Sequence, residues 1–188
     1  MTARKDEEFH WAEEGRTLLA DCKIFTVFNA HRISPQGQRA DRYLLQAPDW
    51  AMVIPLVQSA GNDACLMVRQ YRQGSGTVTM EFPAGMVDPG ETPEAAVARE
   101  LREETGYEAG KLTLLGAVNP NSAIMTNTQY IYLAENLVHR GGLSLDEHED
   151  LEVEVVPLAD VIRQMGRGAY DNGTMMMALG FFLQRQYL

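Results

Sequence analysis

The sequence predicts an α/β (α+β) protein: a curved, mixed β-sheet with helices packed on its faces and a β-hairpin near its N-terminus. The chain has 188 residues, of which 45% are apolar, and this suffices for one sizeable core. Strand-like apolar runs outnumber helical stretches along the chain. No internal repeat or low-complexity linker interrupts them, so a single continuous fold is expected.

The strands are predicted from apolar runs bounded by turn residues. Residues 22–33 and 40–46 flank the turn signal Ser34-Pro35-Gln36-Gly37, which favours the N-terminal hairpin. The remaining strands are expected at residues 50–58, 64–72, 78–82, 111–118, 128–135 and 152–157.

Three helices complete the pattern. Thr92 before Pro93 is a strong start signal, because threonine caps a helix and proline fits its first turn. Gly106 is a natural C-terminal cap. Val97 and Leu101 form an apolar stripe between these ends. The helices are expected at residues 93–105, 158–167 and 174–187.

The chain lacks export and membrane signals. No apolar run approaches the roughly 18–20 residues of a membrane span, and the charged N-terminus does not resemble a signal peptide. Cys22 and Cys65 each lie in a strand-like apolar run and are expected to be small core residues in a reducing compartment. We therefore expect a cytoplasmic protein with no membrane partner.

Negative charge is concentrated in two segments. The net charge is −10; residues 85–107 hold six acids and two bases, and residues 144–154 hold six acids and no base. Such a protein repels nucleic acids and anionic membranes unless cations intervene, so no nucleic-acid partner is expected. The simplest interpretation of both segments is a solvated acidic face. In residues 85–107, however, the spacing of the carboxylates favours a different interpretation.

Three carboxylates share one surface of the first predicted helix. Glu100, Glu103 and Glu104 lie at positions i, i+3 and i+4, where like charges repel. They border the apolar stripe, whereas Arg99 and Arg102 are predicted to point the other way. Semi-buried carboxylates at close quarters need a compensating cation. Mg²⁺ suits them, because it binds a few carboxylates together with water and phosphate oxygens.

Residues 85–107 resemble the Nudix box. Tyr107 is an aromatic residue where an aliphatic one is usual. The matching residues are Gly85, Glu91, Arg99, Glu100, Leu101, Glu103, Glu104, Gly106 and Tyr107. The resemblance implies a Nudix fold, in which a mixed sheet lies between helices. It also implies hydrolysis of a nucleoside diphosphate linked to another group, with Mg²⁺ or Mn²⁺ held by the box glutamates.

The approach to the box, residues 68–72 and 81–85, is similar to that of ADP-ribose pyrophosphatases and related nucleotide-sugar hydrolases. This similarity implies that Arg72 touches the substrate diphosphate and that the Ala84 carbonyl joins the metal shell. Trp50 could stack a base, although core or dimer packing is an equal alternative. The expected substrate-binding residues are Arg72, Glu81, Arg42 and Trp50. The expected metal ligands are Ala84, Glu100, Glu103, Glu104 and Glu149. Glu103 is also expected to be catalytic, and Gly85, Glu91, Arg99 and Gly106 are expected to be structural.

Residues 146–153 resemble the late acidic loop of the same enzymes. The resemblance implies that Glu147 is the general base and Glu149 a metal ligand, although the two roles could be exchanged. It also implies that residues 1–45 form an extension for dimerisation and base recognition, and that residues 46–188 form the hydrolase domain of a homodimer.

The expected function is Mg²⁺-dependent hydrolysis of a nucleoside diphosphate sugar, with ADP-ribose, giving AMP and ribose 5-phosphate, as the best single substrate. Asn119-Pro120-Asn121-Ser122 stands near the place of a Ser-Pro-Gly-like element in these hydrolases, which leaves the substrate within the group open. A nucleotide-pool or cap-removing hydrolase is one alternative, and a non-catalytic nucleotide-binding sensor is another. The acidic composition disfavours an RNA partner.

Overall fold

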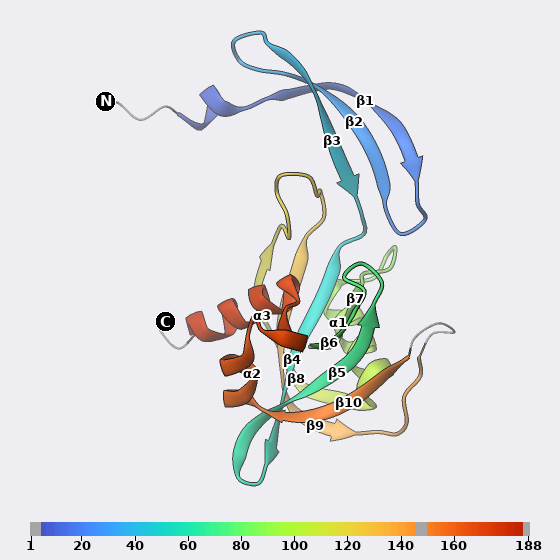
Figure 1. Ribbon diagram of the computed structural model, residues 1–188, viewed down its shortest axis with the longest axis vertical. Helices are drawn as coiled ribbons and strands as arrows, with labels where there is room; N and C mark the ends of the chain where they lie inside the picture. The colour runs from blue at the N-terminus through green and yellow to red at the C-terminus, as the bar shows by residue number, and fades with distance from the viewer. Residues whose placement is uncertain (1–4, 146–149, 186–188) are drawn as a thin grey trace. The chain divides into compact units, whose positions relative to one another are not determined.

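A computed structural model describes residues 5–145 and 150–185. The chain divides into two compact units (Figure 1). The first comprises Met1–Pro48 and Asn119–Asn127, and the second comprises Asp49–Val118 and Thr128–Leu188. Glu147 and Glu149, the proposed base and metal ligand of the acidic loop, lie outside the described residues.

The first unit is an antiparallel sheet of three strands in the order β1-β2-β3. The strands are β1 (Ala12–Asp21), β2 (Thr26–Ile33) and β3 (Arg39–Gln46), preceded by the short 3₁₀ helix η1 (Asp6–Phe9). The predicted hairpin is confirmed, and the Ser34 hydroxyl closes its turn by accepting from the Gln36 and Gln38 amides. The segment 119–127 joins this unit through hydrogen bonds to the backbone of Leu45.

Strand β1 was not predicted, and Cys22 does not lie where it was expected. In β1, glutamates, a glycine and an arginine break the alternation that signals a strand. Cys22 was expected in the core, but it is exposed. It lies in the turn between β1 and β2, where its amide donates to the Phe25 carbonyl and Lys23 adopts a φ of +67°. The chain therefore reverses direction at the residue where the strand was predicted to begin.

The second unit contains the mixed sheet, in the order β10-β5-β4-β9-β8, with β6 paired to β5 and β7 paired to β4. Strands β4 and β9 are parallel, whereas the other pairs are antiparallel. The very short β7 was not predicted. The strands are β4 (Trp50–Ser59), β5 (Asn62–Arg72), β6 (Thr77–Glu81), β7 (Ala84–Met86), β8 (Tyr107–Val118), β9 (Gln129–His139) and β10 (Leu151–Pro157).

Helices cover both faces of this sheet. Successive residues of a strand point to opposite faces, so neighbouring residues of β4 pack in different clusters. Ala51 and Val53 of β4 pack in one cluster with α1 (Pro93–Thr105). Met52 and Ile54 pack in the other, with α2 (Leu158–Gln164) and α3 (Gly173–Gln184), which lie together in Figure 1. The short 3₁₀ helix η2 (Gly168–Tyr170) lies between them in the chain. The predicted sheet between helices is confirmed.

The same core accounts for the second cysteine. Cys65 is buried in the cluster beneath α2 and α3, as expected, and this burial raises the pKa of its thiol to about 12. Within the described ranges, no helix is both long and apolar enough to span a membrane.

Helix α1 begins and ends where its capping residues predict. The Thr92 hydroxyl accepts a hydrogen bond from the Ala95 amide at 3.2 Å. Gly106 ends the helix with a φ of +75°, a conformation that L side chains rarely adopt. A Cβ on Gly106 would also lie 2.1 Å from the Gly141 carbonyl oxygen. These two caps fix which residues of α1 face the sheet.

Candidate active site

Helix α1 presses two of its carboxylates against β7. Glu104 is 2% exposed, and one of its oxygens accepts a hydrogen bond from the Ala84 amide at 3.1 Å. A Cβ on Gly85 would lie 1.9 Å from an oxygen of Glu100, so the carboxylate lies directly against the backbone of β7 and would have to move for any larger residue. The structure thus brings together Ala84, Gly85, Glu100 and Glu104, as the sequence predicts.

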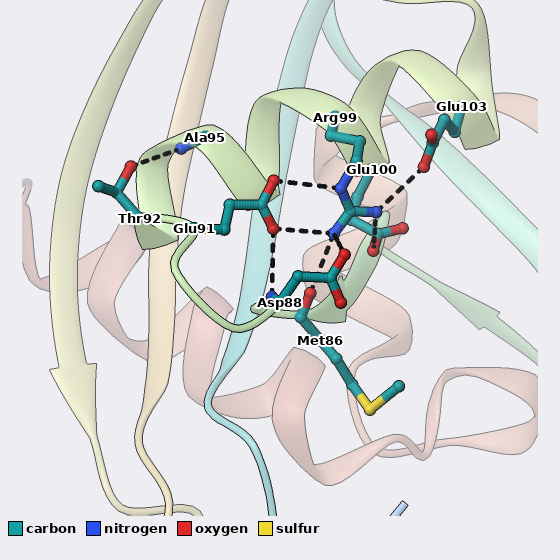
Figure 2. A network of polar contacts seen from close by, with 8 residues as sticks. All are labelled: Met86, Asp88, Glu91, Thr92, Ala95, Arg99, Glu100 and Glu103. Carbon is teal, nitrogen blue, oxygen red and sulfur yellow. Dashed lines mark hydrogen bonds and ion pairs between the residues drawn. The ribbon is translucent and has the colours of Figure 1, made fainter.

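Arg99 joins the carboxylates of this segment into one network (Figure 2). Its guanidinium donates to both oxygens of Glu91, at 3.2 and 3.1 Å. It also donates to Glu100 at 2.7 Å and to Glu103 at 3.1 Å. A further bond, to the Met86 carbonyl, anchors the same guanidinium to β7.

The predicted direction of Arg99 is therefore wrong. Glu103 follows Arg99 at i+4, one helical turn later, where side chains are neighbours on a helix surface. The guanidinium also reaches Glu100. Arg102 does extend elsewhere, toward Glu108 and the Gly142 carbonyl. The expectation failed because it placed Arg99 only relative to the apolar stripe and not relative to Glu103.

The network favours the charged form of Glu91. The hydrogen bond from Arg99 lowers the pKa of Glu91, against a smaller opposing effect of burial. The same bond to Glu91, with those to Glu100 and Glu103, raises the pKa of Arg99. Glu103 remains 37% exposed. One guanidinium thus faces four carboxylates, those of Asp88, Glu91, Glu100 and Glu103, and the network keeps a negative excess.

This donor set fits a hard divalent cation in its chemistry. Carboxylate and carbonyl oxygens are the ligands that Mg²⁺ prefers, and Glu100, Glu103, Glu104 and Ala84 supply both kinds. Among the residues that the structure describes, no three acidic, histidine or cysteine side chains already converge on a metal position. Two of these carboxylates are instead held by Arg99, and Glu104 binds the Ala84 amide.

A pocket of about 270 Å³ lies along β7. It brings Trp50 and Arg72, both predicted to bind substrate, beside Ala84 and Gly85. The lining residues are Trp50, Met52, Arg72, Ala84, Gly85, Met86, Gln129 and Thr174. Ala84 and Gly85 also contact Glu104 and Glu100, respectively. The pocket and the carboxylates of α1 therefore both adjoin β7.

Arg72 reaches the pocket while paired to a buried carboxylate. Its Nε and Nη2 donate to the two oxygens of Glu81, at 3.0 and 2.7 Å. Glu81 is fully buried. Burial alone would raise the pKa of Glu81, but the hydrogen bond and charge of Arg72 outweigh it and lower that pKa. Glu81 is not among the residues that line the pocket.

Arg42 belongs to the other unit. Its guanidinium lies 5.1 Å from the centre of the Trp11 ring and donates to the Asp41 carbonyl. Its predicted contact with substrate stays a prediction.

Four of the residues that line the pocket were not predicted: Met52, Met86, Gln129 and Thr174. Gln129 enters because β9 runs parallel to β4 and pairs it with Trp50. Met52 enters beside Trp50 on the same face of β4. Thr174 lies in the first turn of α3. No local signal marks these three, whereas Met86 directly follows Gly85 in the box.

Known proteins share this architecture. Residues 48–179 match the family profile described as NUDIX domain. An ADP-ribose pyrophosphatase of Bacillus subtilis is 35% identical over 142 residues, which cover 74% of this chain and 75% of that protein. The ADP compounds hydrolase NudE of Escherichia coli is 30% identical over 172 residues, or 90% and 89% of the two chains. A crystal structure of an ADP compounds hydrolase superposes with a TM-score of 0.80 at 25% identity, covering 95% of this chain and 94% of the other.

Proposed function

Because this chain belongs to the Nudix family of hydrolases, we propose that it cleaves the diphosphate bond of an ADP-sugar, with ADP-ribose, giving AMP and ribose 5-phosphate, as the leading substrate. One observation carries the proposal: Arg72 and the box carboxylates meet at β7, the arginine in the pocket and the acids against the same strand. A guanidinium suits phosphate oxygens. The activities for which the B. subtilis and E. coli relatives are named, on ADP-ribose and on ADP compounds, support the choice of ADP-sugars.

The proposed cofactor is Mg²⁺, with Mn²⁺ as a substitute. The residues that would hold it are Ala84 through its carbonyl, Glu100, Glu103, Glu104 and, from the acidic loop, Glu149. When bound, the cation supplies the positive charge that a diphosphate needs among so many carboxylates. Arg99 keeps Glu100 and Glu103 on the β7 side of the helix.

Each remaining residue has a proposed task. Arg72 holds a non-bridging diphosphate oxygen with the part of its guanidinium that faces the pocket, and Trp50 stacks against the base. Glu147 accepts a proton from the attacking water, a role worth about 10²–10⁴ in rate. Glu103 assists at the reacting phosphate. The two acids of the loop could exchange roles.

We further propose that the chain forms a homodimer through residues 1–45, which would also carry Arg42 toward a base. This part of the chain exposes large apolar side chains, which soluble monomers seldom gather. Leu18, Leu19, Ile24 and Tyr43 are each more than half exposed. Light scattering should give about twice the chain mass of 21.0 kDa, and a mass near the single-chain value at micromolar concentration would contradict the dimer.

A hydrolysis screen tests the function. The purified chain is incubated with ADP-ribose, other nucleoside diphosphate sugars, nucleoside triphosphates and capped RNA, each with Mg²⁺, Mn²⁺ or a chelator. We expect AMP and ribose 5-phosphate from ADP-ribose, only with a divalent cation. Faster turnover of triphosphates or caps would favour the other enzyme class, and tight ADP-ribose binding without products would favour a sensor.

A further inference from the structure

The carboxylate that pairs with Arg72 is held by more than that arginine. Glu81 is fully buried, and a buried charge is costly unless its oxygens are satisfied. Both oxygens accept from one guanidinium, at 3.0 and 2.7 Å. This fork-to-fork pairing fixes the plane of the guanidinium relative to Glu81. The direction in which Arg72 points therefore depends on how firmly Glu81 itself is held.

Thr79 is the first side chain that holds Glu81. It lies two residues earlier on β6, is 3% exposed, and donates from its hydroxyl to Oε1 of Glu81 at 2.5 Å. The same hydroxyl also lies 3.3 Å from the Gln70 carbonyl on β5. Because a hydroxyl carries one proton, it donates to Glu81, the nearer acceptor, and Thr79 thus holds the carboxylate from β6.

Asn172 is the second, and it comes from a distant part of the chain. Its side-chain oxygen caps α3 by accepting from the amides of Thr174 and Met175, at 2.9 and 3.1 Å. Its side chain also lies close enough to Glu81 to contribute to the lowered pKa of that carboxylate, with the amide as the donor because a carboxylate only accepts. One side chain therefore connects the start of α3 to the partner of Arg72.

The start of α3 and Arg72 also meet in the pocket. Thr174 lines the pocket with Arg72, and its hydroxyl donates to the Asn172 oxygen at 2.6 Å. The side chain of Arg72 is 42% exposed, so without a fixed partner it would sample many directions. Three donors on one buried carboxylate remove that freedom before a ligand arrives, which is the condition for preorganised binding.

We infer that Asn172 and Thr79 are positioning residues, which act through Glu81 to hold the Arg72 guanidinium toward the pocket. The inference rests on the proposed function, in which Arg72 contacts the substrate diphosphate. Neither residue needs to touch substrate. Their contribution is to ground-state and transition-state binding alike, and it is therefore expected in KM more than in kcat.

Two variants separate positioning from folding. Asn172→Ser keeps a good helix cap but removes the amide that donates to Glu81, and Thr79→Val keeps the shape but removes the hydroxyl. Each should raise KM for ADP-ribose about five- to twentyfold and change kcat less than about threefold, because one bond to a charged group is lost. With divalent cations chelated, the calorimetric Kd for ADP should rise by a similar factor.

A double-mutant cycle identifies the route of the effect. In an Arg72→Gln background, Asn172→Ser should change KM and Kd no further, since the residue through which it acts has been replaced. The matched control is Val161→Ala, a buried truncation in α2 outside the pocket lining. It should lower the unfolding temperature while KM stays at the wild-type value.

The outcomes separate this inference from the proposed function. Wild-type KM in both single variants, or an equal effect of Asn172→Ser with and without Arg72, overturns the positioning role. A wild-type protein that hydrolyses no ADP-sugar refutes the proposed function. The ADP titrations then decide the inference alone, because unchanged Kd values in the variants, or no ADP binding at all, overturn it.

Discussion

Arg72 on β5 and Arg99 on α1 both pair with glutamates beside β7, but they do so in opposite ways. Arg72 gives its fork to one carboxylate, Glu81, which is fully buried. Arg99 divides its donors among three carboxylates, whose side chains are 12–37% exposed. Arg72 is therefore part of the folded framework. Arg99 is a counter-charge whose place a cation can take, while water can hydrate its partners.

The difference follows from desolvation. A buried carboxylate that loses its partner cannot be hydrated, whereas a partly exposed carboxylate can be. Removing the two arginines should therefore have unequal consequences for stability, and adding a cation should relieve only one of them. Four measurements test this contrast.

The largest effect is expected from two carboxylates of the proposed cation site, Glu103 of the Arg99 network and its neighbour Glu104. The double change Glu103→Gln and Glu104→Gln should lower kcat at least about 10³-fold, because it removes charge from the proposed cation site. The fold should persist, since the glutamine at 104 can still accept from the Ala84 amide. Steady-state kinetics with circular dichroism checks both, and near-normal turnover would show that these acids are not catalytic.

Arg72→Ala should be next. It leaves Glu81 buried and short of its main partner, so we expect a loss of about 2–3 kcal/mol in the free energy of unfolding. The loss of a diphosphate contact should also lower kcat/KM about 10²-fold. Urea unfolding and kinetics are the measurements, with Arg69→Ala, an exposed arginine of the same strand, as control. A stability equal to that of the control would remove the framework role.

Arg99→Ala should cost less, about 1 kcal/mol, because its partners are partly solvated. An excess of Mg²⁺ should raise the unfolding temperature of this variant more than that of the wild type, since the cation takes over the missing counter-charge. The same addition should not rescue Arg72→Ala. If Mg²⁺ stabilises all three proteins equally, the proposed exchange between arginine and cation is wrong.

The smallest effect concerns pH. Arg99 lowers the pKa of Glu91, and Arg72, against burial, lowers that of Glu81. An acid whose pKa is lower in the folded state stabilises the fold at pH values above its unfolded-state pKa of about 4.3. That stabilisation is lost as the pH falls through the folded-state pKa. Stability should thus be level from neutral pH to about pH 5 and fall below it.

Glu91→Gln isolates one part of this dependence. Its free energy of unfolding, measured by urea unfolding, should decline less steeply than that of the wild type below about pH 4.5, with a total difference of less than about 1 kcal/mol. The exposed acid Glu8 of η1 provides the control substitution. Parallel curves for the wild type and Glu91→Gln would mean that the ion pair with Arg99 adds nothing to stability.

Local signals predicted α1 and its acidic face. Thr92, Pro93 and Gly106 mark the ends of the helix within one turn of each end, and the structure places the helix at Pro93–Thr105 as predicted. The spacing of Glu100, Glu103 and Glu104 needs only the helical period. The two errors differ in kind: the turn that exposes Cys22 is not visible in a hydrophobic pattern, whereas the i, i+4 spacing of Arg99 and Glu103 is present in the sequence.

The sequence by itself determined which residues carry charge, where the helices and most strands lie, and that three carboxylates share a helix face. Only the tertiary structure decided what they meet. Trp50 and Gln129 adjoin because β4 and β9 pair in parallel, and Asn172 reaches Glu81 from the start of a helix that the chain enters 91 residues later. Spacing within an element follows from backbone geometry, whereas contacts between distant segments follow from strand order and core packing, which no local pattern encodes.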